Sequence, residues 1–163
     1  MKYYYTVMES PVGDITLIAD EESLCAIYWQ NQKPDNKKFP GLEKKDDNKV
    51  LRSSVKQLNS YFKGKRTEFD LPLRPVGTNF QERVWRALTS IGYGETVSYG
   101  DIANNINNPK AVRAVGAAIG KNPISIIIPC HRVIGSNGKL TGFAGGLSTK
   151  EFLLNLENQL GLK

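Results

Sequence analysis

Residues 98–118 read SYGDIANNINNPKAVRAVGAA, and this stretch decides the class of fold that the second half of the chain can adopt. Ser98 with Asp101 three residues later forms a capping-box pattern, which predicts the start of one short helix. Asn108 and Pro109 predict the start of a second helix, because proline suits the first helical position. Two short helices joined by a turn predict a helix-turn-helix, although most helical hairpins bind nothing.

The predicted second helix carries one long side chain, Arg113, among small residues. Small residues permit close packing inside a protein. They would equally let the helix lie flush against a DNA backbone, with Arg113 projecting from it. Both interpretations fit the pattern; the small residues are Ala111, Ala114, Gly116, Ala117 and Ala118.

The rest of the second half is predicted to be mostly helical. Thr78 with Gln81 forms a capping box ahead of FQERVWRALTSI at 80–91. Ser148 with Glu151 has the same spacing and predicts the cap of a last helix. Helices in the second half, combined with the strands predicted below for the first half, predict an α/β (α+β) fold.

The first half is predicted to be a small antiparallel sheet with one helix. Short runs rich in aromatic and β-branched residues at 2–9, 14–20 and 23–29 predict three strands. Residues 30–49 are polar and turn-rich, which predicts a surface loop. The apolar spacing in 50–64 predicts a helix that ends at its final glycine, and TEFDLPLRPVG at 67–77 predicts an extended connector. We therefore expect one domain over 1–75 and a second over 76–163.

Composition places the chain among soluble globular proteins, with 40% hydrophobic and 23% charged residues. No stretch has the apolar length of a membrane span, and the first ten residues lack the order of a signal peptide, so we expect a cytoplasmic protein. The formal net charge is +6. Residues 76–163 hold 9 Lys/Arg against 5 Asp/Glu, which favours an anionic partner such as nucleic acid, or a solubilising surface.

The chain has two cysteines and one histidine. Reduced thiols are the expectation for a chain with so few cysteines. A structural zinc site needs four Cys or His ligands at close spacings, and this chain cannot supply them. The apolar surroundings of Cys25 predict a structural role for that thiol.

The second cysteine lies in IIIPCHRVIG, residues 126–135, directly before the only histidine. A cysteine acts as a nucleophile only as its thiolate. Neighbouring residues of an extended strand point to opposite faces, so His131 would not contact the Cys130 thiol without a tight turn or a bridging water. The pattern favours a relay in which a carboxylate orients His131 and water carries the proton. Glu157 in the last helix is the candidate carboxylate.

Other classes of protein fit parts of this pattern. A buried cysteine after an isoleucine run is often a core residue, and the protein would then be a DNA-binding regulator with an inert thiol. A cysteine hydrolase explains the thiol but not Arg113. The regulator does not explain PCHR beside the glycine-rich GSNGKLTGFAGG, in which glycine lets the backbone approach a flat ligand.

The motif IPCHRVIG resembles the active-site motif of the O6-alkylguanine-DNA alkyltransferases, also called methylated-DNA–protein-cysteine methyltransferases. GETVSYGDIA, NNPKAVRAVGAAIGKNP and LTGFAGGLSTKEFLLNLE resemble further blocks of that family in order and spacing, and together they cover residues 78–158. SPVGDITLIADEESLCAIYW resembles its more variable N-terminal domain. The resemblance implies a ribonuclease H-like first domain and a winged-helix-like second domain.

The resemblance also implies a function: a monomeric protein that binds the minor groove of duplex DNA and flips out a damaged nucleotide. The alkyl group of O6-alkylguanine, and of O4-alkylthymine, would pass to the cysteine once per molecule, without metal or cofactor. Cys130 would be the acceptor, His131 its base through water, and Glu157 the orienting carboxylate. Asn122 would brace the turn before the active-site strand.

The remaining roles that the resemblance implies concern DNA. Arg113 would fill the gap left by the extruded base, and Tyr99 would contact the flipped base. The carbonyls of Cys130 and Val133 and the amide of Ala144 would bind the guanine edge, with Lys150 near the reactive oxygen. The sequence departs from the family at Phe143, where tyrosine is frequent, at Ala144, where some members have serine, and in lacking the zinc site of some relatives.

Overall fold

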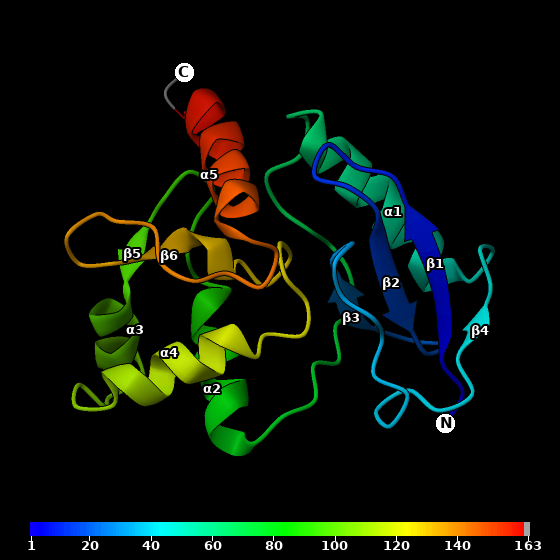
Figure 1. Cartoon of the computed structure of the whole chain (residues 1–163), viewed down its shortest axis with the longest axis horizontal. Helices are drawn as coiled ribbons and strands as arrows, with labels where there is room; N and C mark the ends of the chain where they lie inside the picture. Colours follow the sequence, from blue (N-terminus) through cyan, green and yellow to red (C-terminus); the bar gives the residue numbers. More distant parts are fainter. Residues whose placement is uncertain (162–163) are drawn as a thin grey trace. The chain divides into compact units, whose positions relative to one another are not determined.

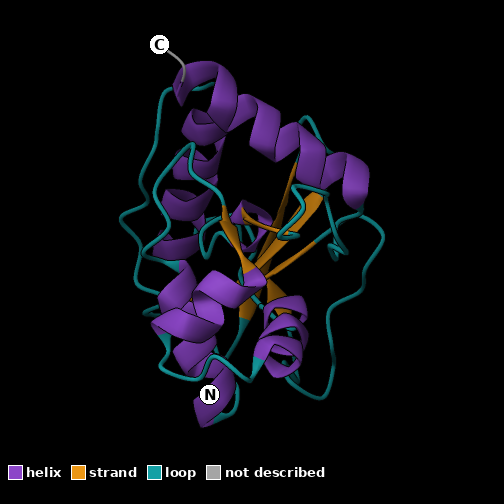
Figure 2. Ribbon diagram, turned by 90° about the vertical axis from the view of Figure 1, so that its left-hand side faces the viewer, coloured by secondary structure: helices purple, strands orange, loops and turns teal. Residues whose placement is uncertain are grey.

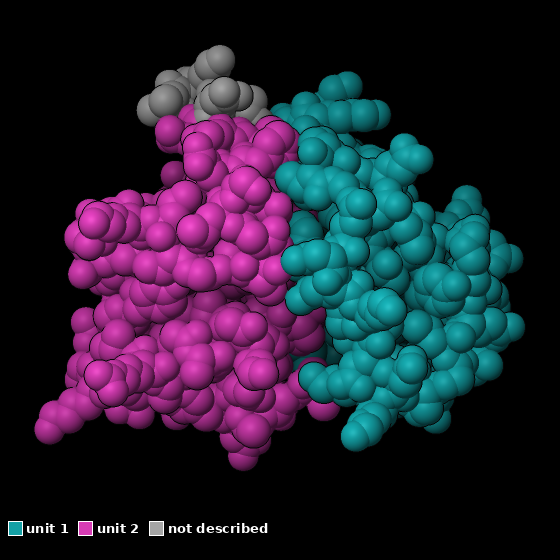
Figure 3. Space-filling model, in the orientation of Figure 1, with its two compact units in different colours: residues 1–75 teal, residues 76–163 magenta. Residues whose placement is uncertain are grey.

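The structure is a computed structural model that describes residues 1–161, with side chains described through residue 158. The chain divides into two compact units, residues 1–75 and residues 76–163, which Figure 3 shows in two colours. Each unit is described by itself below. No helix in the described range is long and apolar enough to cross a membrane.

The first unit is built on a four-stranded sheet with the order β3-β2-β1-β4. Strands β1 (Tyr4–Met8), β2 (Ile15–Ala19) and β3 (Leu24–Tyr28) pair antiparallel, which confirms the three predicted strands. Gly13, at φ 101°, lies in the turn between β1 and β2, where the left-handed backbone favours glycine.

The expectation of a surface loop over 30–49 is wrong in two places. Strand β4 (Glu43–Lys44) adds a short parallel partner to β1. Phe39 is buried and meets the ring of Tyr3 edge-on, with 5.0 Å between ring centroids. One aromatic residue in a polar segment forms no hydrophobic repeat that could predict its burial. The burial of Phe39 depends instead on contacts with residues distant in the sequence.

Helix α1 (Lys49–Phe62) lies against the sheet, as predicted from its apolar spacing (Figure 1). Its first turn is capped by Asn48, whose side chain accepts from the amide of Leu51 at 2.9 Å. Gly64 ends the helix in a left-handed conformation, φ 74°. The buried face comprises Val50, Leu51, Ser54, Gln57, Leu58 and Tyr61.

The connector is extended, as predicted. Leu73 bridges to Leu24 of β3 in parallel, and the amide of Arg74 donates to the Leu24 carbonyl at 2.9 Å. The segment therefore belongs to the first unit up to Pro75.

The second unit is mostly helical, which confirms the predicted fold class, and Figure 2 shows the helices and strands of the whole chain in separate colours. Its helices are α2 (Asn79–Leu88), α3 (Tyr99–Asn105), α4 (Val112–Gly120) and α5 (Leu147–Gly161). Complete capping boxes at Thr78 and Ser98 confirm two predicted helix starts. Helices α3 and α4 pack on each other and on α2, and the two are joined by a turn.

Two predicted helix starts are wrong. Helix α4 begins at Val112 rather than at Pro109, because Asn107 adopts φ 59° and the amide of Ala111 donates to the Asn108 carbonyl in a turn. Helix α5 begins at Leu147, so Ser148 lies inside its first turn and does not cap it. A two-stranded parallel sheet of β5 (Val97–Ser98) and β6 (Val133–Ile134) was not predicted.

Candidate active site

The apolar run before Cys130 forms turns and no strand, which corrects the expectation of an active-site strand. Ile126 has φ 74°, a conformation that is costly for a β-branched residue. The side chain of Asn122 holds the run, since Nδ2 donates to the Ile128 carbonyl at 2.8 Å and Oδ1 accepts from the Ile124 amide at 3.0 Å. A 3-10 helix, η1 (Cys130–Arg132), follows Pro129.

Cys130 lies at the start of η1 and is 6% exposed. Its Sγ donates to Oγ of Ser125 at 3.8 Å. Burial raises the pKa of the Cys130 thiol, while hydrogen bonding with Asn122 and Ser125 and the charge of Lys150 act in the opposite direction. The thiol is therefore largely protonated at neutral pH, and a base must take its proton before it can attack.

His131 and Glu157 are in direct contact, as the relay interpretation requires. Nε2 of His131 lies 2.6 Å from Oε2 of Glu157, and both side chains are buried. Burial lowers the pKa of His131 even though Glu157 opposes this, so the ring is neutral near pH 7. An ionised carboxylate only accepts hydrogen bonds, so Nε2 carries the ring proton and Nδ1 holds the free lone pair.

Nδ1 of His131 has no hydrogen-bond partner within the described part of the chain, although it is fully buried. A buried polar nitrogen is normally hydrogen-bonded, so such an atom needs a functional account. No direct hydrogen bond joins this ring to the Cys130 thiol among the described contacts. This geometry fits proton transfer through a bridging water.

Arg132 is a site residue that the sequence analysis missed. Its Nε donates to Oε1 of Glu157 at 2.8 Å and its Nη2 to Oε2 at 3.0 Å, while Nη1 donates to the Ile91 carbonyl at 2.7 Å. Burial raises the pKa of Glu157, but its hydrogen bonds to His131 and Arg132 and the charge of the Arg132 guanidinium outweigh it and lower the pKa to about 2. The position of Arg132 directly after His131 was the available signal.

Lys150 forms a hydrogen bond with Val133, the residue that directly follows η1. Nζ of Lys150 is buried and donates to the carbonyls of Val133 at 2.7 Å and Thr141 at 3.2 Å. Burial lowers the pKa of Lys150. The ammonium thus ties β6 to the glycine-rich segment that follows it.

The predicted DNA-contacting residues are more exposed. Tyr99, at the start of α3, shares a hydrogen bond with the hydroxyl of Thr141, and its ring lies against Gly116 of α4. Arg113 is exposed on α4, and the other exposed residues of that helix are small or β-branched: Val112, Ala114, Ala117 and Gly120. Ala144 is also exposed, and neither it nor Arg113 has a side-chain contact to the buried centre among the described interactions.

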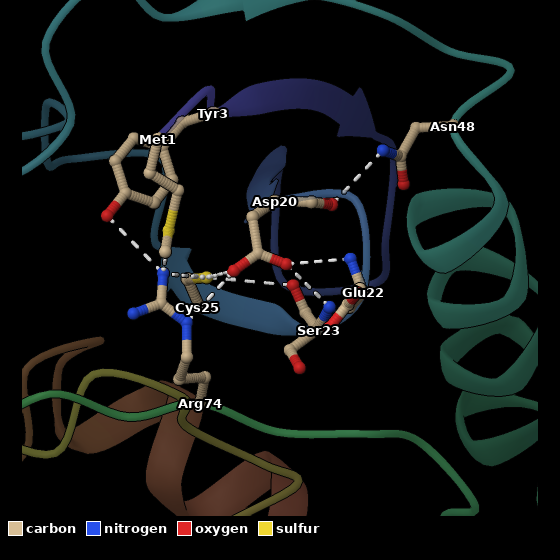
Figure 4. Close-up of polar contacts among 8 residues, drawn as sticks. All are labelled: Met1, Tyr3, Asp20, Glu22, Ser23, Cys25, Asn48 and Arg74. Carbon is tan, nitrogen blue, oxygen red and sulfur yellow. Dashed lines mark hydrogen bonds and ion pairs between the residues drawn. The ribbon is translucent and has the colours of Figure 1, made fainter.

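Cys25 lies in a different environment, in the first unit (Figure 4). Its Sγ is 3.8 Å from Oδ2 of Asp20 and 3.7 Å from Nη2 of Arg74. Arg74 also pairs with Asp20 at 2.9 Å and reaches the hydroxyl of Tyr3 at 3.3 Å. Burial raises the pKa of Cys25, and the carboxylate that its thiol contacts is already paired with Arg74, so this thiol is part of a structural network that ties the connector to the sheet.

Among the described residues, no group of three or more His, Cys, Asp or Glu side chains is placed to hold a metal ion.

Comparison with known proteins gives matches over nearly the whole chain. Residues 79–159 match the DNA-binding domain of 6-O-methylguanine DNA methyltransferase, and residues 3–75 match its ribonuclease-like domain. The methylated-DNA–protein-cysteine methyltransferase of Methanosarcina acetivorans is 53% identical over 155 residues, covering 94% of this chain and 97% of the relative. That of Haemophilus influenzae is 49% identical over 157 residues, covering 94% and 86%.

Solved structures agree with the sequence matches. The structure of Mycobacterium tuberculosis OGT in complex with DNA has a TM-score of 0.88 at 46% identity, covering 98% of this chain and 94% of that one. The structure of the O6-methylguanine methyltransferase of the same organism has a TM-score of 0.87 at 46% identity, covering 96% and 93%.

Proposed function

The chain belongs to the 6-O-methylguanine DNA methyltransferase family, and we propose that Cys130 is the residue to which it transfers the alkyl group of O6-alkylguanine. Its activity is that of a methylated-DNA–protein-cysteine methyltransferase, and it acts on DNA in repair by direct reversal. We assign DNA binding and alkyl acceptance to residues 76–163, which contain every residue of the buried centre.

One observation carries the assignment of Cys130: the thiol directly precedes a neutral histidine whose Nε2 is held by Glu157 and whose Nδ1 is free to accept a proton. The thiol proton passes through water to Nδ1. The resulting imidazolium is stabilised by the Glu157 carboxylate at 2.6 Å. Arg132 keeps that carboxylate ionised and fixes its orientation, so Arg132 and Glu157 are positioning residues.

The transfer itself is a displacement at the alkyl carbon. The Sγ–C bond forms as the C–O6 bond breaks, and the electron pair stays on guanine, which then takes up a proton. The product is a thioether on Cys130. Since no group in the centre can cleave a thioether, each molecule acts once.

The exposed residues account for access to the base. Extrusion of a nucleotide costs a few kcal/mol, and least when the damaged pair is already weak. Arg113 projects from the smooth face of α4 and fills the vacated stack. Tyr99 contacts the flipped base, and the carbonyls of Cys130 and Val133 with the amide of Ala144 bind its edge. Lys150 holds the Val133 carbonyl in place and lies near the reactive oxygen.

Finer features belong to the same proposal. The protein binds the minor groove as a monomer, through helices α3 and α4, and also accepts O4-alkylthymine. Both described cysteines are free thiols, which fits a cytoplasmic protein.

Mass spectrometry of the protein after incubation with duplex DNA containing O6-methylguanine tests the assignment. We expect one added methyl group on Cys130 and none on Cys25. An unmodified protein would favour an inert DNA-binding regulator, and turnover without stable alkylation would favour a hydrolase.

A further inference from the structure

A basic surface lies on helix α1, in the unit that does not contain the alkyl acceptor. The exposed residues of α1 and its C-cap are Lys49, Arg52, Lys56, Asn59 and Lys63. Four of these five carry positive charge, and α1 contains no acidic residue. Their spacing of three or four residues places them on one face of the helix, opposite the face packed on the sheet.

These cations have no side-chain partners among the residues that the structure describes. The side chains of Lys49, Arg52, Lys56 and Lys63 make no hydrogen bond or ion pair with any described residue. Like charges at this spacing repel one another along a helix by a few tenths of a kcal/mol per pair, so the arrangement does not help α1 to form. The protein thus retains a one-sided charge that its own fold does not use.

A surface groove runs along this stripe. Arg52, Lys56 and Lys63 line it together with the hydroxyl- and amide-bearing Asn59 and Ser60. The facing wall comes from strand β1 and from Asp46, the groove's one carboxylate, which accepts from Thr6 at 2.7 Å and from Lys44 at 3.1 Å. Asp46 is paired with Lys44, and the three cations among the lining residues leave the groove with a net positive charge beside neutral donors.

We propose that the α1 stripe, defined as Arg52, Lys56 and Lys63 with Lys49 at its head, is a second contact surface for the phosphate backbone of DNA. Phosphate contacts in protein–DNA complexes come from Lys and Arg with Ser, Thr and Asn, which is the composition of this groove. From Lys49 to Lys63 the helix rises about 21 Å, a distance over which one DNA strand carries about six phosphates.

An acidic protein is the less favoured occupant. Protein interfaces are anchored by buried aromatic and large apolar side chains and are depleted in lysine. The groove offers only Val7 and Val55 as apolar residues and no aromatic ring. The composition therefore suits a polar, strongly charged interface of the kind that DNA forms. The proposed stripe rests on DNA being the partner, as in the proposed function, and it does not depend on which residue accepts the alkyl group.

A salt titration of full-length protein on an unmodified duplex tests the stripe. The variant Arg52→Gln/Lys56→Gln/Lys63→Gln removes three charges from an exposed face, and glutamine retains helix propensity. The matched control Lys33→Gln/Lys37→Gln/Lys38→Gln removes the same charge from exposed positions elsewhere in the same unit. The slope of log affinity against log salt should fall in magnitude by about 2 to 3 in the stripe variant, at about 0.9 per lost phosphate contact. The control should change it by less than 1.

An unchanged salt slope in the stripe variant would overturn the proposal, as would an equal fall of the slope in the control variant. Binding of both variants to polyglutamate tests an acidic protein as the occupant. A stripe variant that loses binding to polyglutamate but keeps its affinity for DNA would also overturn the proposal. Circular dichroism should show both variants folded. Both should react with free O6-benzylguanine at the unmodified rate, because that reaction needs no DNA. If neither the unmodified protein nor the variants became alkylated, the assignment of Cys130 would be refuted. The salt slopes would still test whether the α1 stripe contacts DNA.

Discussion

Arg132 holds both carboxylate oxygens of Glu157, at 2.8 and 3.0 Å, across 25 residues of sequence. The same carboxylate binds Nε2 of His131, so two consecutive residues of η1 share one acidic partner on α5. This arrangement sets the tautomer of the only histidine. It also makes the relay part of the core of the second unit, because all three side chains are buried.

Replacing the acceptor thiol should abolish transfer. Cys130→Ser is expected to lose methyl transfer to duplex DNA while retaining affinity for an unmodified duplex, because the exposed helices supply binding. Single-turnover transfer from labelled DNA measures the first quantity and fluorescence anisotropy the second. Cys25→Ala is the matched control and should transfer at the unmodified rate. Residual labelling of Cys25 in the Cys130→Ser protein would contradict the assignment.

Removing the charge of Glu157 should affect both rate and stability. Glu157→Gln leaves the buried Arg132 guanidinium without a counterion, a change that typically costs 3–5 kcal/mol. It also loosens the orientation of His131, so reaction with free O6-benzylguanine should slow at least about tenfold, a part of the roughly 10²–10⁴-fold that general acid–base catalysis contributes. Glu151→Gln, an exposed position on the same helix, should leave both the rate and the free energy of unfolding unchanged.

Arg132 should act on rate through Glu157. Arg132→Lys keeps the charge but loses the two-pronged contact and the bond to the Ile91 carbonyl, since a lysine cannot reproduce the guanidinium fork. We expect slower alkylation of Cys130 and a shifted pH dependence of that rate, because the carboxylate that tunes His131 is no longer fixed. A loss of stability with an unaltered pH–rate profile would restrict Arg132 to a structural role.

Stability should fall with acidification in two steps. Burial lowers the pKa of His131 in the folded protein below its unfolded value near 6.5. Between these two pKa values the unfolded chain binds a proton that the native protein does not. The free energy of unfolding therefore decreases as pH falls through this range. The pKa of Glu157 is lowered to about 2, so its contribution is present above its unfolded value near 4.3 and is lost as pH falls toward 2. The second step amounts to about 3 kcal/mol.

Denaturant unfolding at a series of pH values measures both steps. His131 is the sole histidine, so the first step has a single source. His131→Gln should abolish the dependence between pH 5 and 7, and a dependence that persists there would assign it to another group.

Arg113 should matter for duplex substrates and not for the free base. Arg113→Ala removes the side chain that we propose fills the vacated stack, so repair of O6-methylguanine in duplex DNA should slow far more than reaction with free O6-benzylguanine. Fluorescence of 2-aminopurine at the target position reports extrusion directly. The control Arg86→Ala removes an exposed arginine from α2. If Arg113→Ala matches the unmodified protein in both the rate ratio and the 2-aminopurine signal, Arg113 does not replace the base.

Local patterns in the sequence were enough to predict much of the fold. The capping boxes at Thr78 and Ser98 and the apolar spacing of α1 depend on residues three or four apart, and all were confirmed. Prediction failed at the start of α4, where the left-handed Asn107 and a turn compete with the proline signal. It also failed over 30–49, where Phe39 joins the core.

For the site, the sequence by itself singled out Cys130 as the candidate nucleophile and His131 beside it, because PCHR is a local and specific pattern, and it offered Glu157 in the last helix as the candidate carboxylate. Only the tertiary structure decided that Arg132 completes the centre, that Nδ1 is the free ring nitrogen, and that Ile126 adopts a left-handed backbone. These features depend on α5 meeting η1 in a buried environment. In a buried environment the ionised Glu157 carboxylate is stable only when hydrogen-bonding and charged partners surround it. The spacing of residues along the chain does not predict which side chains those partners are.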